Sequence, residues 1–411
     1  MIGSGIFLLP ASLAIYGGIS LVGWACSSVG AILLAIVFGG LSKQMPSANG
    51  GPYAYTKKGL GHFPAFLVAW GYWISIWSTN AAIAVALVGY LAVFFPILAT
   101  NPLAAIGTGL SFIWFFTWIN TKQIKTVGFV QLITTILKII PIFLVGLFGI
   151  FFINTDYFIP FNLSGESNWS AITATTTMTF FAFLGMESAT IPSGQVANAE
   201  STIRKATILG TSVAIGIYIL SSAAIMGILP AEVLAKSHAP FADAAEVFWG
   251  KGASYLVAIG AIISTMGALN GWLLMQGQIP MAAAQDELFP KVFQRKNKNG
   301  APAIGIVLSS ILVSVLMMIN YHETLVSAFT FMMTLSTLSV ITPYIFSTAC
   351  FVLFLPKNEK RYDGNYIISF LAFCFSLWII VGCGKEVVFY GFLLLMLGIP
   401  VYVCLRRGQK K

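Results

Sequence analysis

Two short Gly-rich sequences interrupt apolar segments in the two halves of the chain. One is IGSGIFLLP at 2–10 and the other is LGMESATIP at 184–192, and in each a Pro follows the first Gly by seven residues. A break in an apolar helix frees backbone N–H and C=O groups, which a membrane tolerates only where they line a cavity or bind something. Paired interruptions in two halves of a membrane protein are a pointer to a transport site. We therefore expect the two sequences to bind a small polar solute together.

The polarity of each break predicts which part of the solute it binds. The helix that resumes after Gly5 would present free N–H groups and the positive end of its dipole, which suit a carboxylate. The half-helix that ends near Leu184 would present free carbonyls, which suit an ammonium group. The pair is therefore predicted to hold the zwitterionic end of an α-amino acid. The alternative interpretation is that these small residues only permit close helix packing.

Two charged side chains lie deep in apolar segments. Glu187 is the only acidic residue so placed, and an intramembrane carboxylate is a functional candidate. It is interpreted as a group that takes up and releases a proton, with a purely structural hydrogen-bonding role as the alternative. Lys138 is the only basic residue in the middle of a segment. The Lys138 ammonium group is interpreted as a substitute for a bound cation or as a group that exchanges a proton, with a fixed structural charge as the alternative. In each case Lys138 argues against a Na⁺ ion at its own site.

One face of segment 63–96 combines aromatic side chains with an amide. Positions 73, 76, 77 and 80 share a helical face, which ends in Asn80. Trp272 lies far from both ends of its own segment, and a desolvated Trp face binds a cation with about 2 kcal/mol. These residues are interpreted as the lining of a pocket, with an ordinary packed aromatic stripe as the alternative. Ser336 is a weaker candidate of the same kind.

The composition is that of a polytopic membrane protein. The chain has 411 residues, of which 58% are hydrophobic and 9% charged, whereas a soluble domain carries about 25% charged residues. The net charge of +9 does not indicate nucleic acid, because the basic residues lie in short loops between apolar segments. The five cysteines lack metal-ligand spacing, so neither a metal nor a cofactor is expected. The sequence also lacks HExxH, paired intramembrane carboxylates and a Ser/His constellation, which argues against an enzyme.

Counting Lys and Arg predicts the topology. If the loop after the second apolar segment is cytoplasmic, 18 of the 22 basic residues lie on the cytoplasmic side and three on the outer side. Both termini are then cytoplasmic, in a cytoplasmic (inner) membrane. The prediction rests on an all-α protein with twelve apolar segments, at 1–17, 19–42, 63–96, 102–119, 126–153, 170–192, 206–230, 252–280, 302–319, 325–355, 366–382 and 386–405.

The same topology predicts an inverted repeat. The first and sixth segments start on opposite sides, so the five-helix units 1–153 and 170–355 have opposite orientations, with 366–405 appended as two further helices. This 5+5 architecture is expected of alternating-access transporters, in which the first, second, sixth and seventh segments rock against the rest. The first segment is shorter than the ~20 residues that a span needs, so we expect it to lack its cytoplasmic half.

Several of these sequences resemble the amino acid–polyamine–organocation transporters, and within them the basic amino acid/polyamine antiporters. The resemblance is carried by 2–10, 50–55, 183–189 and Gly271-Trp272. It implies a leucine-transporter-like fold and sodium-independent exchange of small molecules, with the lipid bilayer as surroundings and a homodimer as a possible assembly. It also implies that Glu187 and Tyr53 take part in acid activation, that Phe181 and Trp272 gate the substrate, and that Tyr72 belongs to an outer gate.

The resemblance further implies a set of substrate contacts. The carboxylate would meet the backbone at Ser4 and Gly5, and the α-amine would meet carbonyls at Met1 and Leu184. The substrate side chain would lie among residues of the third, sixth, eighth and tenth segments, namely Ser75, Ile76, Asn80, Phe181, Trp272 and Ser336.

Three departures from these relatives leave two functions open. Phe181 stands where the relatives carry Trp, Ile76 replaces a small polarisable residue, and Lys138 is similar to a lysine in proton-coupled relatives that carry neutral amino acids. The favoured function is exchange of a basic amino acid against its amine product or another amino acid. The alternative is a proton-coupled symporter of neutral or broad-range amino acids that uses Lys138 and Glu187.

Overall fold

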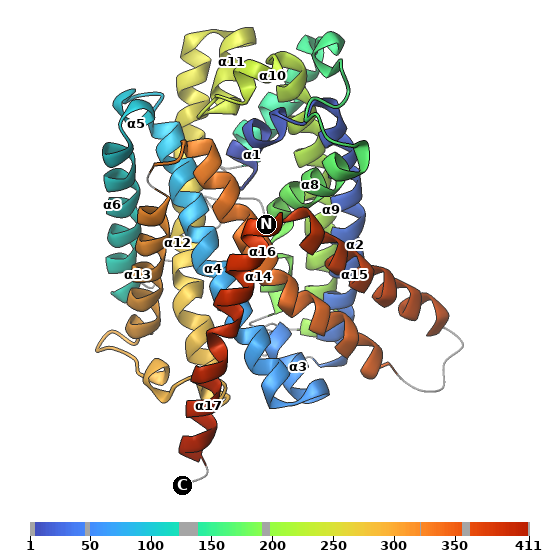
Figure 1. Ribbon diagram of the computed structural model, residues 1–411, viewed down its shortest axis with the longest axis vertical. Coiled ribbons are helices and arrows are strands. Elements are labelled where there is room, and N and C mark those ends of the chain that lie inside the picture. The colour runs from blue at the N-terminus through green and yellow to red at the C-terminus, as the bar shows by residue number, and fades with distance from the viewer. Residues whose placement is uncertain are drawn as a thin grey trace.

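The computed structural model describes residues 5–45, 50–122, 139–190, 198–320, 322–355 and 362–409, and its described part is all-helical, with no strand among those residues (Figure 1). Met1, Ser4 and Lys138 lie outside the described residues, so the expectations placed on them stay predictions. The helices of the first half are α1 Gly5–Ala14, α2 Ser20–Gln44, α3 Pro52–Leu60, α4 His62–Leu91, α5 Ile97–Thr100, α6 Pro102–Thr121 and an apolar helix at Ile139–Phe152.

The second half contains one interrupted helix and a series of longer ones. The interrupted helix consists of α8 Asn168–Phe180 and the 3₁₀ turns Phe181–Phe183 and Met186–Thr190. The remaining helices are α9 Ala199–Ile228, α10 Ala231–Leu234, α11 Pro240–Trp249, α12 Lys251–Gln285, α13 Ala303–Ile319, α14 Leu325–Leu353, α15 Tyr362–Gly382, α16 Lys385–Met396 and α17 Gly398–Gln409.

Eight segments of the described chain are long and apolar enough to cross a membrane, by length and composition. They confirm that the protein is an α-helical, multi-pass membrane protein. The other four predicted segments are represented by shorter or interrupted helices, namely α1, Ile139–Phe152, α8 with its two 3₁₀ turns, and α13. The last predicted segment, 386–405, is divided into α16 and α17 at Leu397. The count of twelve spans stays a prediction.

Helix α4 forms the centre of the molecule. In its most apolar stretch 94% of the residues are buried, and it packs along α12 and α14 (Figure 1). A second group is formed by α2, which packs against α8 and α9. Because every residue of α1 after Gly5 is buried, this short helix is enclosed by its neighbours. It contacts both groups, through α14 and α4 on one side and α8 and α9 on the other.

The bundle has two distinct ends. Helix α3 and the end of α17 lie at one end, whereas α5, α10 and α11 lie at the other (Figure 1). At the α3 end, Lys57 of α3 is paired with Asp286, directly after α12. The predicted topology makes this end cytoplasmic and the α11 end external.

Candidate functional site

The helix that begins with α8 is interrupted at Leu184-Gly185, where the sequence predicts a break. Leu184 has an extended backbone (φ −58°, ψ 140°), and Gly185 has a φ of +92°, which favours glycine. The Leu184 N–H donates to the Phe181 carbonyl in the tight turn before the break, at 3.1 Å. The chain then resumes as the 3₁₀ turn Met186–Thr190, which carries Glu187. A regular helix is therefore replaced here by backbone whose polar groups need other partners.

The start of α1 lies against the 3₁₀ turn Phe181–Phe183 that precedes this break. A Cβ atom added to Gly5 would be 3.0 Å from the Phe181 ring carbon Cε1 and 3.7 Å from the Ala182 Cα. The Phe181 ring also packs edge-on to Phe329 of α14, with centroids 6.0 Å apart. The start of α1 thus lies against the turn that precedes the break, with the Phe181 side chain between α1 and α14.

Hydroxyl groups join the middle of α4 to α14. The Ser336 hydroxyl donates to the Ser75 carbonyl at 2.9 Å and lies 2.6 Å from the Thr79 hydroxyl oxygen. The Ser75 and Ser336 hydroxyl oxygens are 3.1 Å apart. All three residues are buried. The structure therefore brings together two residues that the sequence places 261 positions apart, and adds Thr79 to them.

An amide network joins α4 to α12 and α13. The Asn80 side-chain N–H donates to Gln276 Oε1 at 2.8 Å, and Gln276 Nε2 donates to the Ile306 carbonyl and to the Ser310 hydroxyl. Asn80 Oδ1 is buried and has no hydrogen-bond partner among the described residues. A buried acceptor of this kind is a favourable position for an N–H group of a ligand.

Trp272 lies one helical turn before Gln276 on α12, on the same face of the helix. Its side chain is half-buried and packs against the core. Trp272 and Asn80 therefore come from neighbouring helices, and Gln276, one turn from Trp272, accepts a hydrogen bond from Asn80. Ile76, one turn before Asn80 on α4, is fully buried and adds an apolar surface.

Glu187 is completely buried and binds three hydrogen-bond donors. The Tyr72 hydroxyl donates to Oε1 at 2.7 Å, and the Tyr344 hydroxyl donates to Oε2 at 2.6 Å. The Gly185 N–H also donates to Oε2, at 3.2 Å. These bonds tie the turn after the break to α4 and α14, so the position of Glu187 is coupled to the geometry of the break.

Tyr72 lies ten residues from the start of α4 at His62 and nineteen from its end at Leu91. Its hydroxyl contacts the turn after the break through Glu187. The place of Tyr72 in an outer gate stays a prediction.

Tyr53 and Asp286 lie together at the α3 end. Gly50 and Gly51 have φ values of +107° and +61° and form the turn into α3, which starts at Pro52. Burial of Tyr53, and secondarily the nearby Asp286 carboxylate, raises the pKa of Tyr53 well above its usual range. Its phenol therefore stays neutral at physiological pH, so any contribution of Tyr53 to acid activation has to act through its neighbours.

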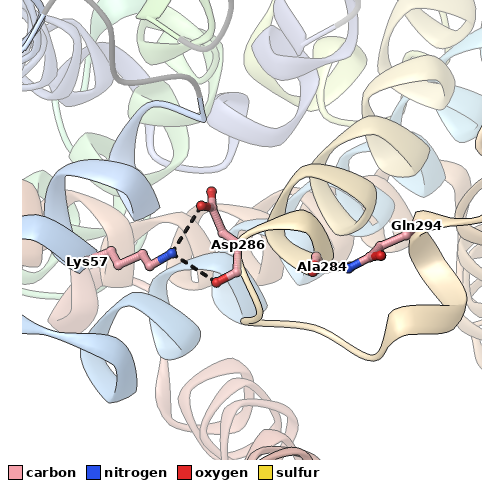
Figure 2. A network of polar contacts seen from close by, with 4 residues as sticks. All are labelled: Lys57, Ala284, Asp286 and Gln294. Carbon is pink, nitrogen blue, oxygen red and sulfur yellow. Dashed lines mark hydrogen bonds and ion pairs between the residues drawn. The ribbon is translucent and has the colours of Figure 1, made fainter. Parts of the chain in front are cut away.

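Lys57 extends the contact between α3 and the end of α12. Figure 2 shows its ammonium group between the Asp286 carboxylate and the Asp286 carbonyl, each 3.0 Å from Lys57 Nζ. Nearby, Gln294 donates to the Ala284 carbonyl and holds the chain that leaves α12 (Figure 2). Helix α3 is thus linked to the end of α12 by an ion pair and by a hydrogen bond from Lys57 to the Asp286 backbone carbonyl.

A double-mutant cycle on Lys57→Ala and Asp286→Ala is expected to give a small coupling energy. The pair is partly exposed, with side-chain exposures of 30% and 39%, so its coupling energy should be about 0.2–1 kcal/mol. Asp286→Ala should destabilise more than Lys57→Ala, since Asp286 also faces Tyr53. Thermal unfolding of the four proteins in detergent measures both effects, and a coupling energy above about 2 kcal/mol would show that the pair is better shielded than its exposure indicates.

Several residues of this region were not found from the sequence. The sequence could have identified Gln276, because it is a polar residue one turn from Trp272 in an apolar segment. It gives no indication of the roles of three others, because these depend on partners that are far away in the sequence. The three are Tyr344, Thr79 and Asp286.

An interrupted helix that meets the start of α1 inside an all-helical bundle is typical of a membrane transporter. The chain belongs to the amino acid permease family, whose family model matches residues 1–400. This confirms the resemblance seen in the sequence.

Three named relatives are antiporters. The chain is 32% identical over 406 residues to an arginine/ornithine antiporter of Pseudomonas aeruginosa, covering 94% of this chain and 84% of the relative. It is 35% identical over 322 residues to a cadaverine/lysine antiporter of Escherichia coli, covering 78% and 71%. It is 31% identical over 438 residues to an arginine/agmatine antiporter of Chlamydia trachomatis, covering 100% and 88%. Each relative exchanges a basic amino acid for another amino acid or an amine, by its name.

Proposed function

We propose that this protein is a sodium-independent antiporter that exchanges a basic amino acid for its amine product or another amino acid across the cytoplasmic membrane. The observation that carries the proposal is the contact between Gly5 of α1 and the Phe181–Ala182 turn of the interrupted helix. This contact places the start of α1 beside the turn that precedes the break, and the named relatives supply the class of substrate.

The proposed binding mode follows the polarity of the two breaks. The substrate carboxylate binds at the start of α1, at Ser4 and Gly5, and the α-amine binds carbonyls of Met1 and Leu184. The cationic side chain points toward the free Oδ1 of Asn80 and toward the Trp272 ring. The remaining proposed contacts, which border the same region, are Ser75, Ile76, Phe181 and Ser336.

The proposed transport mechanism is alternating access in a twelve-span protein with both termini in the cytoplasm. The packing of α2 with α8 and α9, and of α4 with α12 and α14, supports two bodies that move against each other. In this proposal the units 1–153 and 170–355 are inverted repeats and 366–405 adds two helices. Glu187 couples the two bodies, since it belongs to the interrupted helix and binds α4 and α14.

The proton-coupled symporter is not favoured, because the named relatives are antiporters. An exchange assay separates the two functions. Purified protein in liposomes loaded with unlabelled arginine should take up labelled arginine at acid and neutral pH, with choline in place of Na⁺, whereas empty liposomes should not. Uptake of neutral amino acids into empty liposomes under an inward proton gradient, without arginine exchange, would overturn the proposal.

Trp272→Ala is expected to weaken arginine far more than a neutral amino acid. Loss of a desolvated cation–π contact of about 2 kcal/mol corresponds to roughly 30-fold weaker binding. Trp272→Phe should restore part of this loss, because Phe keeps an aromatic face. Trp118→Ala on α6 is a suitable control, since that ring is exposed. Competition by arginine and by leucine in the exchange assay measures the effect, and an equal loss for both would exclude selection by the Trp272 ring.

A further inference from the structure

A cavity lies on the α11 side of the break, and none of the substrate contacts proposed above lines it. Its volume is about 710 Å³, and it is lined by α1, α8, α14 and the junction of α15 with α16. Met178 of α8 borders it, one helical turn before Phe181. The Phe181 ring, which packs between Gly5 and Phe329, therefore lies one turn further along the same chain, between Met178 and the break.

The cavity has one carboxylate and several neutral polar groups. Glu166 is the only charged side chain that lines it within the described residues. The Ser170 hydroxyl donates to Glu166 Oε2, which fixes that oxygen and leaves the carboxylate able to accept from a cation. Deeper in the cavity, Thr330 donates to the Ser12 hydroxyl at 2.8 Å. An uncompensated carboxylate in a cleft concentrates cations there.

Aromatic rings stand beside this carboxylate. Tyr16 lines the cavity and lies close enough to Glu166 for the two groups to interact electrostatically. Trp169 also lines it and is 67% exposed, although its ring is stacked on Trp378 with centroids 5.4 Å apart. Carboxylate and aromatic faces together are the groups that bind ammonium and guanidinium ions.

The length of α8 separates the Glu166 carboxylate from the break in the interrupted helix. Helix α8 has 13 residues between the Glu166 loop and the Phe181 turn, which corresponds to a rise of about 20 Å. A single amino acid cannot contact Glu166 and the break at once. A solute held at Glu166 therefore occupies a position distinct from the one between the two interrupted helices.

We propose that this cavity is an outer binding site for organic cations, in which Glu166 binds the guanidinium or ammonium group of a solute before it passes Phe181. The proposal rests on the function proposed above, because it takes the solute to be the cationic substrate. Because Glu166 is exposed, the site captures solute weakly and speeds its arrival at the break.

Glu166→Gln tests the proposal in the liposome exchange assay. The variant should raise the external KM for labelled arginine about three- to tenfold at low ionic strength and leave kcat unchanged. The difference should shrink at about 0.3 M salt, because exposed charges are screened. Glu232→Gln is the matched control, since Glu232 is exposed on α10 at the same end and does not line the cavity. An unchanged KM, or an equal rise with Glu232→Gln, overturns the site.

A binding measurement separates failure of this site from failure of the proposed function. Saturation-transfer NMR with agmatine on detergent-solubilised protein needs no transport. A signal that is lower in Glu166→Gln than in Glu232→Gln supports the cation site even if the wild-type protein exchanges no arginine. An equal signal in both variants, with normal exchange by the wild-type protein, overturns the site and leaves the proposed function standing.

Discussion

Glu187→Gln is expected to flatten the pH dependence of exchange while leaving substrate affinity close to that of the wild-type protein. Glutamine keeps the size of the side chain and one acceptor oxygen, so the turn after the break keeps much of its shape. It cannot bind or release a proton, so any pH dependence that arises at this position is lost. Initial rates of arginine exchange between pH 5 and 8 measure the effect.

Glu187→Ala should have a much larger effect on stability. It leaves the Tyr72 and Tyr344 hydroxyls and the Gly185 N–H without their acceptor inside the protein. Each buried donor left unpaired costs about 1–3 kcal/mol, so the alanine variant should lose several times the stability lost by Tyr344→Phe, which removes a single hydroxyl. Thermal unfolding in detergent gives this comparison.

These variants distinguish the two interpretations of Glu187. If Glu187→Gln has the wild-type pH profile and Glu187→Ala is unstable, the carboxylate is structural and pH sensing lies elsewhere. A flat profile in Glu187→Gln together with a normal profile in Tyr344→Phe assigns the titration to the carboxylate itself.

The helical class and the break at Leu184-Gly185 were predictable because they follow from local properties. The length of each apolar run sets the position of a helix, and Gly185 marks a backbone position with positive φ that other residues rarely adopt. The division of the last segment at Leu397 was not predicted.

The partners of the site residues were harder to predict. Asn80 and Trp272 were found as members of polar or aromatic helical faces, but no property of either face identifies the helix that it meets. That choice depends on the rotation of α4, α12 and α14 about their axes, which is set by packing along their whole lengths. Tyr344 and Lys57 illustrate this, because their partners lie 157 and 229 positions away.

Gln276→Leu is expected to reduce exchange strongly, although Gln276 is not itself among the proposed substrate contacts. The change removes the acceptor of the Asn80 N–H and the donor to the Ile306 carbonyl and the Ser310 hydroxyl. Without Gln276, the Asn80 amide is free to rotate, and its Oδ1 no longer has a fixed direction toward a ligand. We therefore expect a rise of about tenfold or more in KM, equivalent to about 1.4 kcal/mol, together with a lower unfolding temperature.

Two further substitutions separate positioning of Asn80 from general loss of packing. Gln276→Glu keeps the acceptor for Asn80 and loses the donor, so it should retain a lower KM than Gln276→Leu. Asn270→Leu removes another amide of α12, which bonds to Asn120 of α6 and not to α4, so it should lower stability with little change in KM. If Asn270→Leu and Gln276→Leu raise KM equally, the network acts only through the stability of α12. If only Gln276→Leu raises KM, the direction of the Asn80 amide determines how well the substrate binds.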